Sequence, residues 1–220
     1  MDTKLQIDNI LKNDINNFEK CLEKIISTQD IFLQKDLSNF MFNNPKRLRP
    51  IFTFLFARAL KVENESVLKI ALAQELIHSA SLIHDDIIDE EKIRRGEETF
   101  YYKYGAKKSV ILGDLLLSLS LEILAETNIE IVKIFSEKIK KTILGELKQN
   151  SQNHKTINEA DYFEKTFNKT GNLFLAGLES LFVLKETDKE IQKNYINFLK
   201  NFSIAFQIKN DLDDFLKKES

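Results

Sequence analysis

Residues 81–91 read Ser-Leu-Ile-His-Asp-Asp-Ile-Ile-Asp-Glu-Glu and place three aspartates, Asp85, Asp86 and Asp89, at the end of an otherwise apolar segment. On a helix, residues four apart lie on one face, so Asp85 and Asp89 share a face and Asp86 lies about a quarter-turn away. Carboxylates that are buried together repel each other unless a cation lies between them. Oxygen ligands of this kind suit Mg²⁺, which keeps several waters and bridges to phosphates. Taken alone, an acidic helix end is more often only a solvated face.

A second acidic cluster lies near the end of the sequence, in Asn210-Asp211-Leu212-Asp213-Asp214. Asp214 follows Asp211 by three residues and Asn210 by four, so these three side chains also share a helix face. Two such clusters on long helices can face each other across a bundle and hold several divalent ions. A diphosphate substrate needs such ions, because they neutralise its charge and stabilise the pyrophosphate as it leaves.

The pattern around these clusters is helical from end to end. Six glycines and two prolines in 220 residues are too few to separate many strands. Apolar residues recur every three or four positions between Ile7 and Ile25, which marks one buried helix face. With no repeat, linker or domain boundary, we expect an all-α fold and a single domain over residues 1–220. Helices are expected at about 7–25, 31–42, 51–60, 65–89, 107–126, 128–149 and 160–184, and from 188 almost to the end.

The connections between these helices are polar. Residues 43–50 hold both prolines and are expected to form a loop, and Asn64 is expected to cap the helix that follows it. Arg94-Arg95-Gly96 forms a polar connection, and the helix over 160–184 is expected to be interrupted at residues 169–171.

Charge and composition exclude several classes of protein. A net charge of −2 gives no support for nucleic acid binding, which normally leaves a basic excess. One cysteine, Cys21, rules out an internal disulfide framework and fits a reducing cytoplasm. We expect no transmembrane segment, because the most apolar stretch, residues 110–125, is short and is interrupted by Asp114 and Glu122. We therefore expect a cytoplasmic protein.

Six motifs, in this order, resemble the signatures of the trans-isoprenyl (polyprenyl) diphosphate synthase family. They are Pro45-Lys46-Arg47-Leu48-Arg49-Pro50 (with proline where the family usually has glycine), His78 to Asp89, Arg94-Arg95-Gly96, the pair Gly113-Asp114 that opens the following helix, Lys169-Thr170, and Phe206-Gln207-Ile208. Each motif is weak by itself, but six in the family's order are specific, and they extend through nearly the whole chain.

The resemblance implies the isoprenoid synthase fold, a bundle of long, mostly antiparallel helices around a central cavity. It implies an enzyme that condenses isopentenyl diphosphate with an allylic diphosphate, using several Mg²⁺ ions that bridge to the diphosphate. In the implied mechanism the allylic diphosphate ionises, isopentenyl diphosphate attacks the carbocation, and a proton is lost to the departing pyrophosphate. The family is usually dimeric, so a homodimer is expected.

The resemblance also assigns roles to single residues. The metal ligands are expected to be Asp85, Asp89, Asp211 and Asp214, with Asp86 in support. The isopentenyl diphosphate site is expected to contain Lys46, Arg49, His78 and Arg95. The allylic diphosphate site is expected to contain Arg94 and Lys169, with oxygen atoms of Thr170 and Gln207 facing the allylic cation. Taken singly, each basic residue is as well explained as ordinary solvated charge.

The product length is expected to depend on the residues just before Asp85. Ala80 and Ser81 lie one turn deeper on the same helix, where aromatic side chains stop the product early in the family. Two small residues leave that turn open, so we expect a product longer than C15. The alternative is a C15 or C20 product, as in farnesyl or geranylgeranyl diphosphate synthases, with the floor of the cavity set by Ile77 or by leucines of residues 111–124.

Two departures from the family pattern leave alternatives open. Asn210 stands where the second motif usually begins with aspartate, and a neutral amide is a poorer Mg²⁺ ligand. The sequence ends at Ser220, and we expect that C-terminal helices of the family are lacking. A non-catalytic subunit of a heteromeric synthase is therefore an alternative, although it would not need Asp85, Asp89 and Arg94. A terpene cyclase would not need Lys46 or His78, and a four-helix di-metal protein would need Glu-x-x-His pairs, which do not occur.

Overall fold

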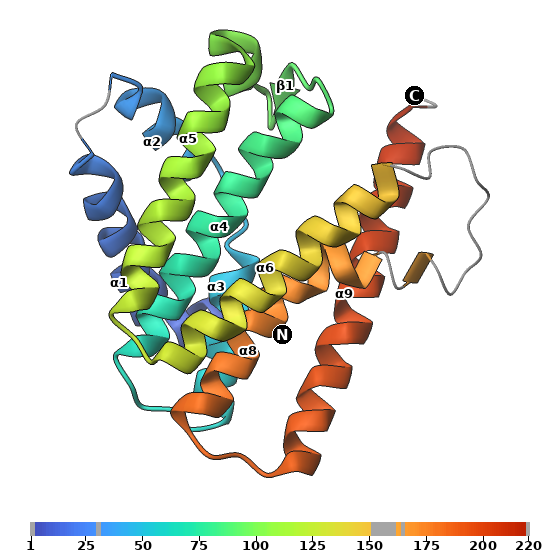
Figure 1. The fold of residues 1–220 in the computed structure, drawn as a ribbon. Coiled ribbons are helices and arrows are strands. Elements are labelled where there is room, and N and C mark those ends of the chain that lie inside the picture. The colour runs from blue at the N-terminus through green and yellow to red at the C-terminus, as the bar shows by residue number, and fades with distance from the viewer. Residues whose placement is uncertain (1–2, 30–31, 151–161, 164–165, 219–220) are drawn as a thin grey trace. The chain divides into compact units, whose positions relative to one another are not determined.

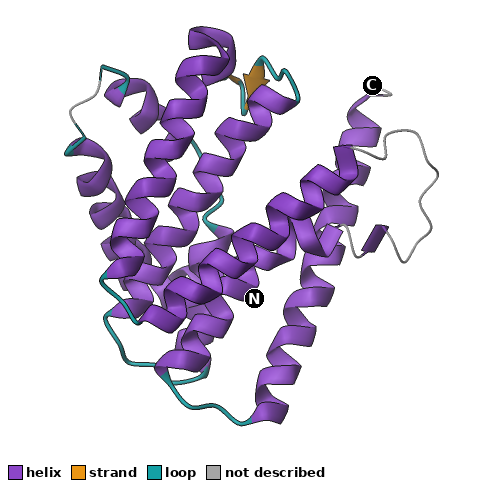
Figure 2. Cartoon of the chain, viewed as in Figure 1, coloured by secondary structure: helices purple, strands orange, loops and turns teal. Residues whose placement is uncertain are grey.

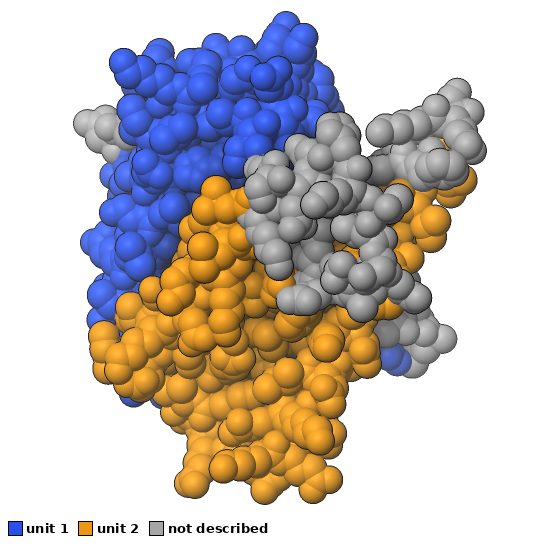
Figure 3. Space-filling view, turned by 45° about the vertical axis from the view of Figure 1, so that its right-hand side comes forward, with its two compact units in different colours: residues 1–128 blue, residues 129–220 orange. Residues whose placement is uncertain are grey.

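In the computed structural model, the described residues are 3–29, 32–150, 162–163 and 166–218, and they are almost entirely helical (Figure 1, Figure 2). The expected all-α fold is thus confirmed. The chain forms two compact units, residues 1–128 and residues 129–220 (Figure 3). That these form a single domain, and that C-terminal helices are lacking, stay predictions.

Unit 1 is built around one helix, α4. The helices of this unit are α1 (Thr3–Ser27), α2 (Gln34–Phe42), α3 (Leu48–Ala59), α4 (Ser66–Ile88) and α5 (Phe100–Ala125). α4 packs against α1, α3 and α5, and every residue from 70 to 77 is buried. By length and composition α4 is apolar enough to cross a bilayer, but 67% of its most apolar window is buried inside the structure, as in any core helix.

The proline-containing loop ends earlier than expected, because α3 begins at Leu48 rather than near residue 51. Pro50 fits the first turn of α3, where a backbone N–H has no helical acceptor to lose. Arg47, just before the helix, has φ 47° and ψ 30°, a left-handed conformation that costs a non-glycine residue roughly 1–2 kcal/mol. The N-cap of α4 is Glu65, one residue after the predicted Asn64, and its side chain makes no capping hydrogen bond; Asn64 Oδ1 still accepts a hydrogen bond from the N–H of Ser66, the first residue of the helix, at 2.8 Å.

Arg94-Arg95-Gly96 lies in a small β-hairpin. β1 (Ile93–Arg94) pairs with β2 (Glu97–Glu98) in antiparallel register, with Arg94 opposite Glu97. The two turn residues, Arg95 and Gly96, have φ values of 53° and 82°. Positive φ at both positions is typical of the tight turns that match the twist of a two-stranded ribbon. The turn therefore fixes the backbone on either side of the two arginines.

α5 begins at Phe100, seven residues before the expected start, because Thr99 caps it: the Thr99 Oγ1 atom accepts a hydrogen bond from the Tyr102 N–H at 3.1 Å. The helix is broken at Gly105, whose φ of 77° is outside the helical range. The expectation of a helix from residue 107 therefore found the longer segment and missed the short one before the break. Gly113-Asp114 lies inside α5 and does not open it.

Unit 2 contains α6 (Ile129–Asn150), the π-turn η1 (Phe167–Gly171), α8 (Asn172–Leu184) and α9 (Lys189–Lys218). α6 packs against α8, and η1 contacts α6, α8 and α9. The interruption predicted at residues 169–171 is confirmed as part of η1. A Cβ atom at Gly171 would lie 2.4 Å from Cδ2 of Phe167, so glycine lets the Phe167 ring lie against the backbone.

Candidate active site

The three aspartates of the first cluster lie at the C-terminal end of α4, in two different environments. Asp85 is half-buried and Asp89, which caps the helix, is exposed. The Asp89 N–H donates to the Asp85 carbonyl at 2.8 Å, so the last turn is intact and the two side chains lie one turn apart on one face. Asp86 is only 1% exposed.

Asp85 and Asp89 fit a magnesium site by the chemistry of their donors. Both offer hard carboxylate oxygens that solvent reaches, and Mg²⁺ commonly takes one or two carboxylates together with waters and substrate phosphates. Within the described residues no group of three or more His, Cys, Asp or Glu side chains is placed to hold a metal ion. A pair of carboxylates suits an ion that is shared with a substrate better than one that is held by protein alone.

Asp86 instead pairs with Arg94. The Arg94 Nε atom donates to Asp86 Oδ1 at 2.6 Å, and the other oxygen, Oδ2, is buried with no hydrogen-bond partner in the described structure. Burial raises the pKa of the Asp86 carboxyl, and the charge of Arg94 opposes that shift. The carboxylate therefore joins the end of α4 to the hairpin.

A cluster of four arginines lies close enough to His78, two turns before Asp85 on α4, to act on its charge. Burial lowers the pKa of His78 well below its usual value, and the positive charges of four arginines lower it further: Arg49, Arg95, Arg94 and Arg47. Burial also lowers the pKa of Arg49 to about 10, with Glu75 opposing the shift. Arg49 stays charged and His78 stays neutral at pH 7, so the cluster is a cationic site with a neutral hydrogen-bonding imidazole.

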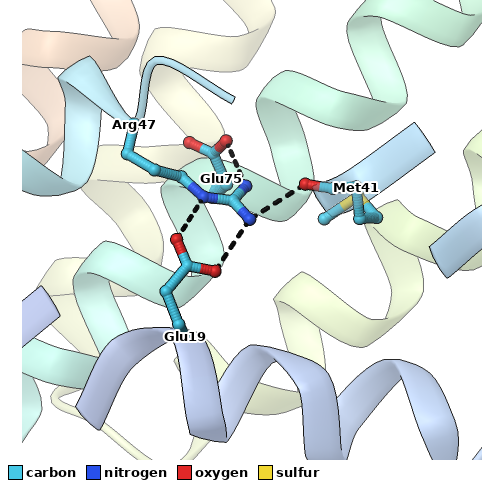
Figure 4. Close-up of polar contacts among 4 residues, drawn as sticks. All are labelled: Glu19, Met41, Arg47 and Glu75. Atoms are coloured by element: carbon cyan, nitrogen blue, oxygen red, sulfur yellow. Dashed lines mark hydrogen bonds and ion pairs between the residues drawn. The ribbon is translucent and has the colours of Figure 1, made fainter. Parts of the chain in front are cut away.

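The buried Arg47 side chain forms ion pairs with Glu19 and Glu75 and a hydrogen bond with Met41 (Figure 4). Its Nε atom donates to Glu19 at 2.7 Å, its Nη1 atom to Glu75 at 2.8 Å, and its Nη2 atom to the Met41 carbonyl at 2.9 Å. Hydrogen bonds and charges from Glu19 and Glu75 raise the pKa of Arg47 despite its burial. The Arg47 guanidinium group therefore has a structural role, because it joins α1, the end of α2 and α4.

The predicted isopentenyl diphosphate residues are brought together in part. Arg49, His78 and Arg95 belong to the cluster, as does Arg94 from the predicted allylic site. Lys46 is exposed on the same loop, directly before Arg47. Both predicted sites therefore draw on one cationic region of unit 1.

The predicted chain-length residues differ in exposure. Ala80 and Ile77 are 0% and 5% exposed, in the core of unit 1, whereas Ser81 is exposed and donates from Oγ to the His78 carbonyl at 2.7 Å. His84, on the next turn, packs against α5, where its Nε2 atom lies 3.3 Å from the Val110 carbonyl oxygen.

In unit 2, three predicted site residues form a chain of contacts. Thr170 Oγ1 lies 3.4 Å from Gln207 Oε1, and Gln207 Nε2 donates to Asp211 Oδ1 at 2.7 Å. The Tyr162 hydroxyl donates to the other Asp211 oxygen, and this bond raises the pKa of Tyr162. Asn210 is half-buried beside Asp211. The side chains of Lys169 and Asp214 lie outside the described residues, so their predicted roles stay predictions.

Sequence reasoning missed Tyr162, Glu19 and Glu75. Glu75 had a visible signal, because it is a charged residue inside the apolar run Ile70–Ile77 and lies three residues before His78, on the same face. Glu19 and Tyr162 had none, since their partners are 28 and 49 positions away in the sequence.

Comparisons with known proteins identify the family of this chain. Residues 32–220 match the family model described as Polyprenyl synthetase. A prenyl transferase from Cyanidium caldarium is 35% identical over 209 residues, covering 93% of this chain and 65% of the relative. An all trans-polyprenyl-diphosphate synthase from Homo sapiens is 36% identical over 203 residues, covering 88% and 48%. The chain thus spans about half to two-thirds of the length of these curated relatives.

Two solved structures share the fold. A geranyltranstransferase from Thermotoga maritima matches with a TM-score of 0.82 at 30% identity, covering 92% of this chain and 78% of that one. A polyprenyl synthase from Caulobacter crescentus, complexed with calcium and isoprenyl diphosphate, matches with a TM-score of 0.85 at 27% identity, covering 93% and 63%.

Proposed function

Because the chain belongs to the polyprenyl synthetase family, we propose that it is a trans-prenyltransferase that joins isopentenyl diphosphate to an allylic diphosphate. The observation that carries the proposal is the pairing of Asp85 and Asp89 at the end of α4 with the arginine cluster around His78, in one unit of the structure. The two substrates each bring a diphosphate, and the two parts of this region suit the two ways of binding one: through a metal ion or directly by cations.

The residues of unit 1 divide the work of binding. Asp85 and Asp89 would hold Mg²⁺, which when bound neutralises the charge of the allylic diphosphate. Arg94 would bind the same diphosphate directly, while Arg49, Arg95 and Lys46 would hold isopentenyl diphosphate. His78, neutral because its pKa is lowered, would donate a hydrogen bond without adding charge. The calcium in the Caulobacter crescentus structure supports a divalent ion, and we extend this to magnesium.

In unit 2, Thr170 and Gln207 would place oxygen atoms near the developing allylic cation. The bond from Gln207 Nε2 to Asp211 supports this role, because it fixes which end of the amide is nitrogen and leaves Oε1 on the side of Thr170. Asp211 would contribute to the second metal site, with Asp214 beside it.

We also propose a product longer than C15. Ala80 and Ser81 are small, and the Homo sapiens relative is a polyprenyl synthase. A C15 or C20 product remains the alternative, because the geranyltranstransferase from Thermotoga maritima has the same fold. A homodimer is the proposed assembly and the cytoplasm the proposed location, with a non-catalytic subunit of a heteromer as the second assembly, favoured by Asn210 in the second motif.

The test is an assay of purified protein with magnesium, isopentenyl diphosphate and farnesyl diphosphate. We expect pyrophosphate release in proportion to isopentenyl diphosphate consumed, and loss of both on chelation of the metal. Protein that is folded, saturated with both substrates and magnesium, and still releases no pyrophosphate would contradict the proposal. Size measurement of the active species would separate homodimer from heteromer.

A further inference from the structure

Two adjacent aspartates of the first cluster have opposite surroundings. The side chain of Asp86 is 2% exposed and is held by Arg94, whereas Asp85 is half-buried and lies on the face of Asp89. A carboxylate that is buried and already bonded to a guanidinium is poorly placed to coordinate a solvent-exchanging ion. Asp86 therefore needs a role of its own.

The hairpin that carries Arg94 is tied to the end of α4 at several points. The Glu91 N–H donates to the Asp86 carbonyl at 2.9 Å, and Thr99 Oγ1 donates to the Glu91 carbonyl at 2.6 Å. At the base of the hairpin the Thr99 N–H donates to the Lys92 carbonyl at 2.9 Å. The backbone of Arg94 is thereby fixed relative to Asp86.

The geometry of the ion pair decides which part of Arg94 is left for a ligand. Asp86 receives the Nε hydrogen, which is the one nearest the side-chain stem. Among the described residues no other hydrogen-bond partner of the Arg94 side chain is seen, so the donors of its two terminal Nη groups are available to a ligand. The side chain is 29% exposed, and Arg94 lines a pocket together with Arg95 and Asp86. Two parallel Nη donors are the fork that binds a phosphate oxygen pair.

We propose that Asp86 is a positioning residue for Arg94, which it orients so that the Nη groups face the allylic diphosphate, and that it is not a metal ligand. The inference rests on the proposed prenyltransferase function. The three aspartates then have two different roles: Asp85 and Asp89 bind the metal ion, and Asp86 orients Arg94.

The test compares Asp86→Ala, Arg94→Ala, the double variant and Asp85→Asn in the full chain. For each we measure kcat, KM for the allylic diphosphate, KM for isopentenyl diphosphate, and the magnesium concentration that gives half-maximal rate. Removing a partner that orients a ligand-binding side chain typically lowers affinity or activity about 10- to 100-fold. We expect Asp86→Ala and Arg94→Ala to raise KM for the allylic diphosphate by similar factors in this range, and the double variant to add little. The magnesium requirement should stay at the wild-type value in both, and rise in Asp85→Asn.

A second variant keeps the test sharp if Asp86→Ala does not fold. Asp86→Asn retains the volume and an oxygen that can accept from Arg94 Nε, so it should have a lower KM for the allylic diphosphate than Arg94→Ala, again with wild-type magnesium dependence. A higher magnesium requirement in either Asp86 variant, matching Asp85→Asn, would overturn the inference. So would full additivity of Asp86→Ala and Arg94→Ala. An inactive wild-type protein would instead reject the proposed function, so the two failures are distinguishable.

Discussion

The Nη1 atom of Arg47 lies 2.8 Å from Oε1 of Glu75, and both side chains are almost fully buried. Glu75 also acts on Arg49 and Arg95, whose pKa values it raises against the effect of burial. One buried carboxylate thus offsets part of the charge of three arginines. This arrangement lets a strongly cationic cluster exist inside unit 1.

Replacing Glu75 by alanine should destabilise the protein, because it leaves a buried guanidinium with half of its counter-charge. Breaking a buried ion pair costs about 3–5 kcal/mol, and we expect about 3 kcal/mol because Glu19 still pairs with Arg47. Urea unfolding measures this difference. Glu65→Ala is the control, since that side chain is 89% exposed and should change stability by less than about 1 kcal/mol. An effect of Glu75→Ala no larger than that of the control would show that the Arg47–Glu75 ion pair does not stabilise the fold.

His78 should make stability depend on pH on the acid side. Its pKa is lowered in the folded protein, so between that value and the unfolded value of about 6.5 the unfolded chain binds more protons. The stabilisation is fully present above pH 6.5 and is lost as pH falls, at a limiting slope of about 1.4 kcal/mol per pH unit. The free energies of unfolding of wild type and His78→Gln, each plotted against pH, should have equal slopes only above pH 6.5. Equal slopes between pH 5 and 6.5 would contradict the lowered pKa.

Asp85→Asn and Asp89→Asn should each lower kcat/KM by about 100-fold or more, since each removes a charged donor to the metal. The half-maximal magnesium concentration should rise in both variants. Glu63→Gln, which removes one exposed acid from unit 1, serves as the control and should leave both quantities at wild-type values. The proposed metal role fails for either aspartate whose variant keeps the wild-type magnesium dependence.

Ala80→Phe should shorten the product, because a ring at this position would fill the turn below the first aspartate cluster. Ala80 is fully buried, so the larger side chain should also cost about 1–3 kcal/mol of stability through overpacking. Chromatography of the products gives the chain length, and thermal unfolding the stability. Ala106→Phe, at an exposed position of α5, is the matched control and should change neither. An unchanged product distribution in folded Ala80→Phe protein would place the floor of the cavity elsewhere.

Gly113→Ala should have opposite effects in two backgrounds. A Cβ atom at Gly113 would lie 2.2 Å from His84 Nε2, so alanine would displace the imidazole and destabilise the wild-type protein. With His84→Ala already in place the clash is absent, and replacing glycine inside a helix should stabilise by up to about 1 kcal/mol. Thermal unfolding of the wild type, the two single variants and the double variant measures both effects. The same sign in both backgrounds would mean that His84 does not pack on Gly113.

Periodicity and motif order sufficed to predict most of the helices, whereas the roles of the site residues stay predictions. The helix ending at Asp89 could be predicted because its apolar face and acidic end are local in sequence, as could the interruption at Gly171. The start of α5 could not be predicted, because the sequence from Thr99 to Gly105 looks like a single loop. The separate role of Asp86 could not be predicted either: helical spacing places it beside Asp85, and only the folded hairpin brings Arg94 to it.

The π-turn at residues 167–171 has a consequence for the whole of its helix. A turn closed by i→i+5 hydrogen bonds holds one residue more than an α-helical turn, and one residue corresponds to about 100° of rotation. Deleting Asn168 would therefore restore the α-helical repeat and rotate the Thr166 side chain about the helix axis relative to Asn172. The extra residue thus lets Thr166 and the buried face of α8 each point in a direction that an unbroken α-helix would not allow together.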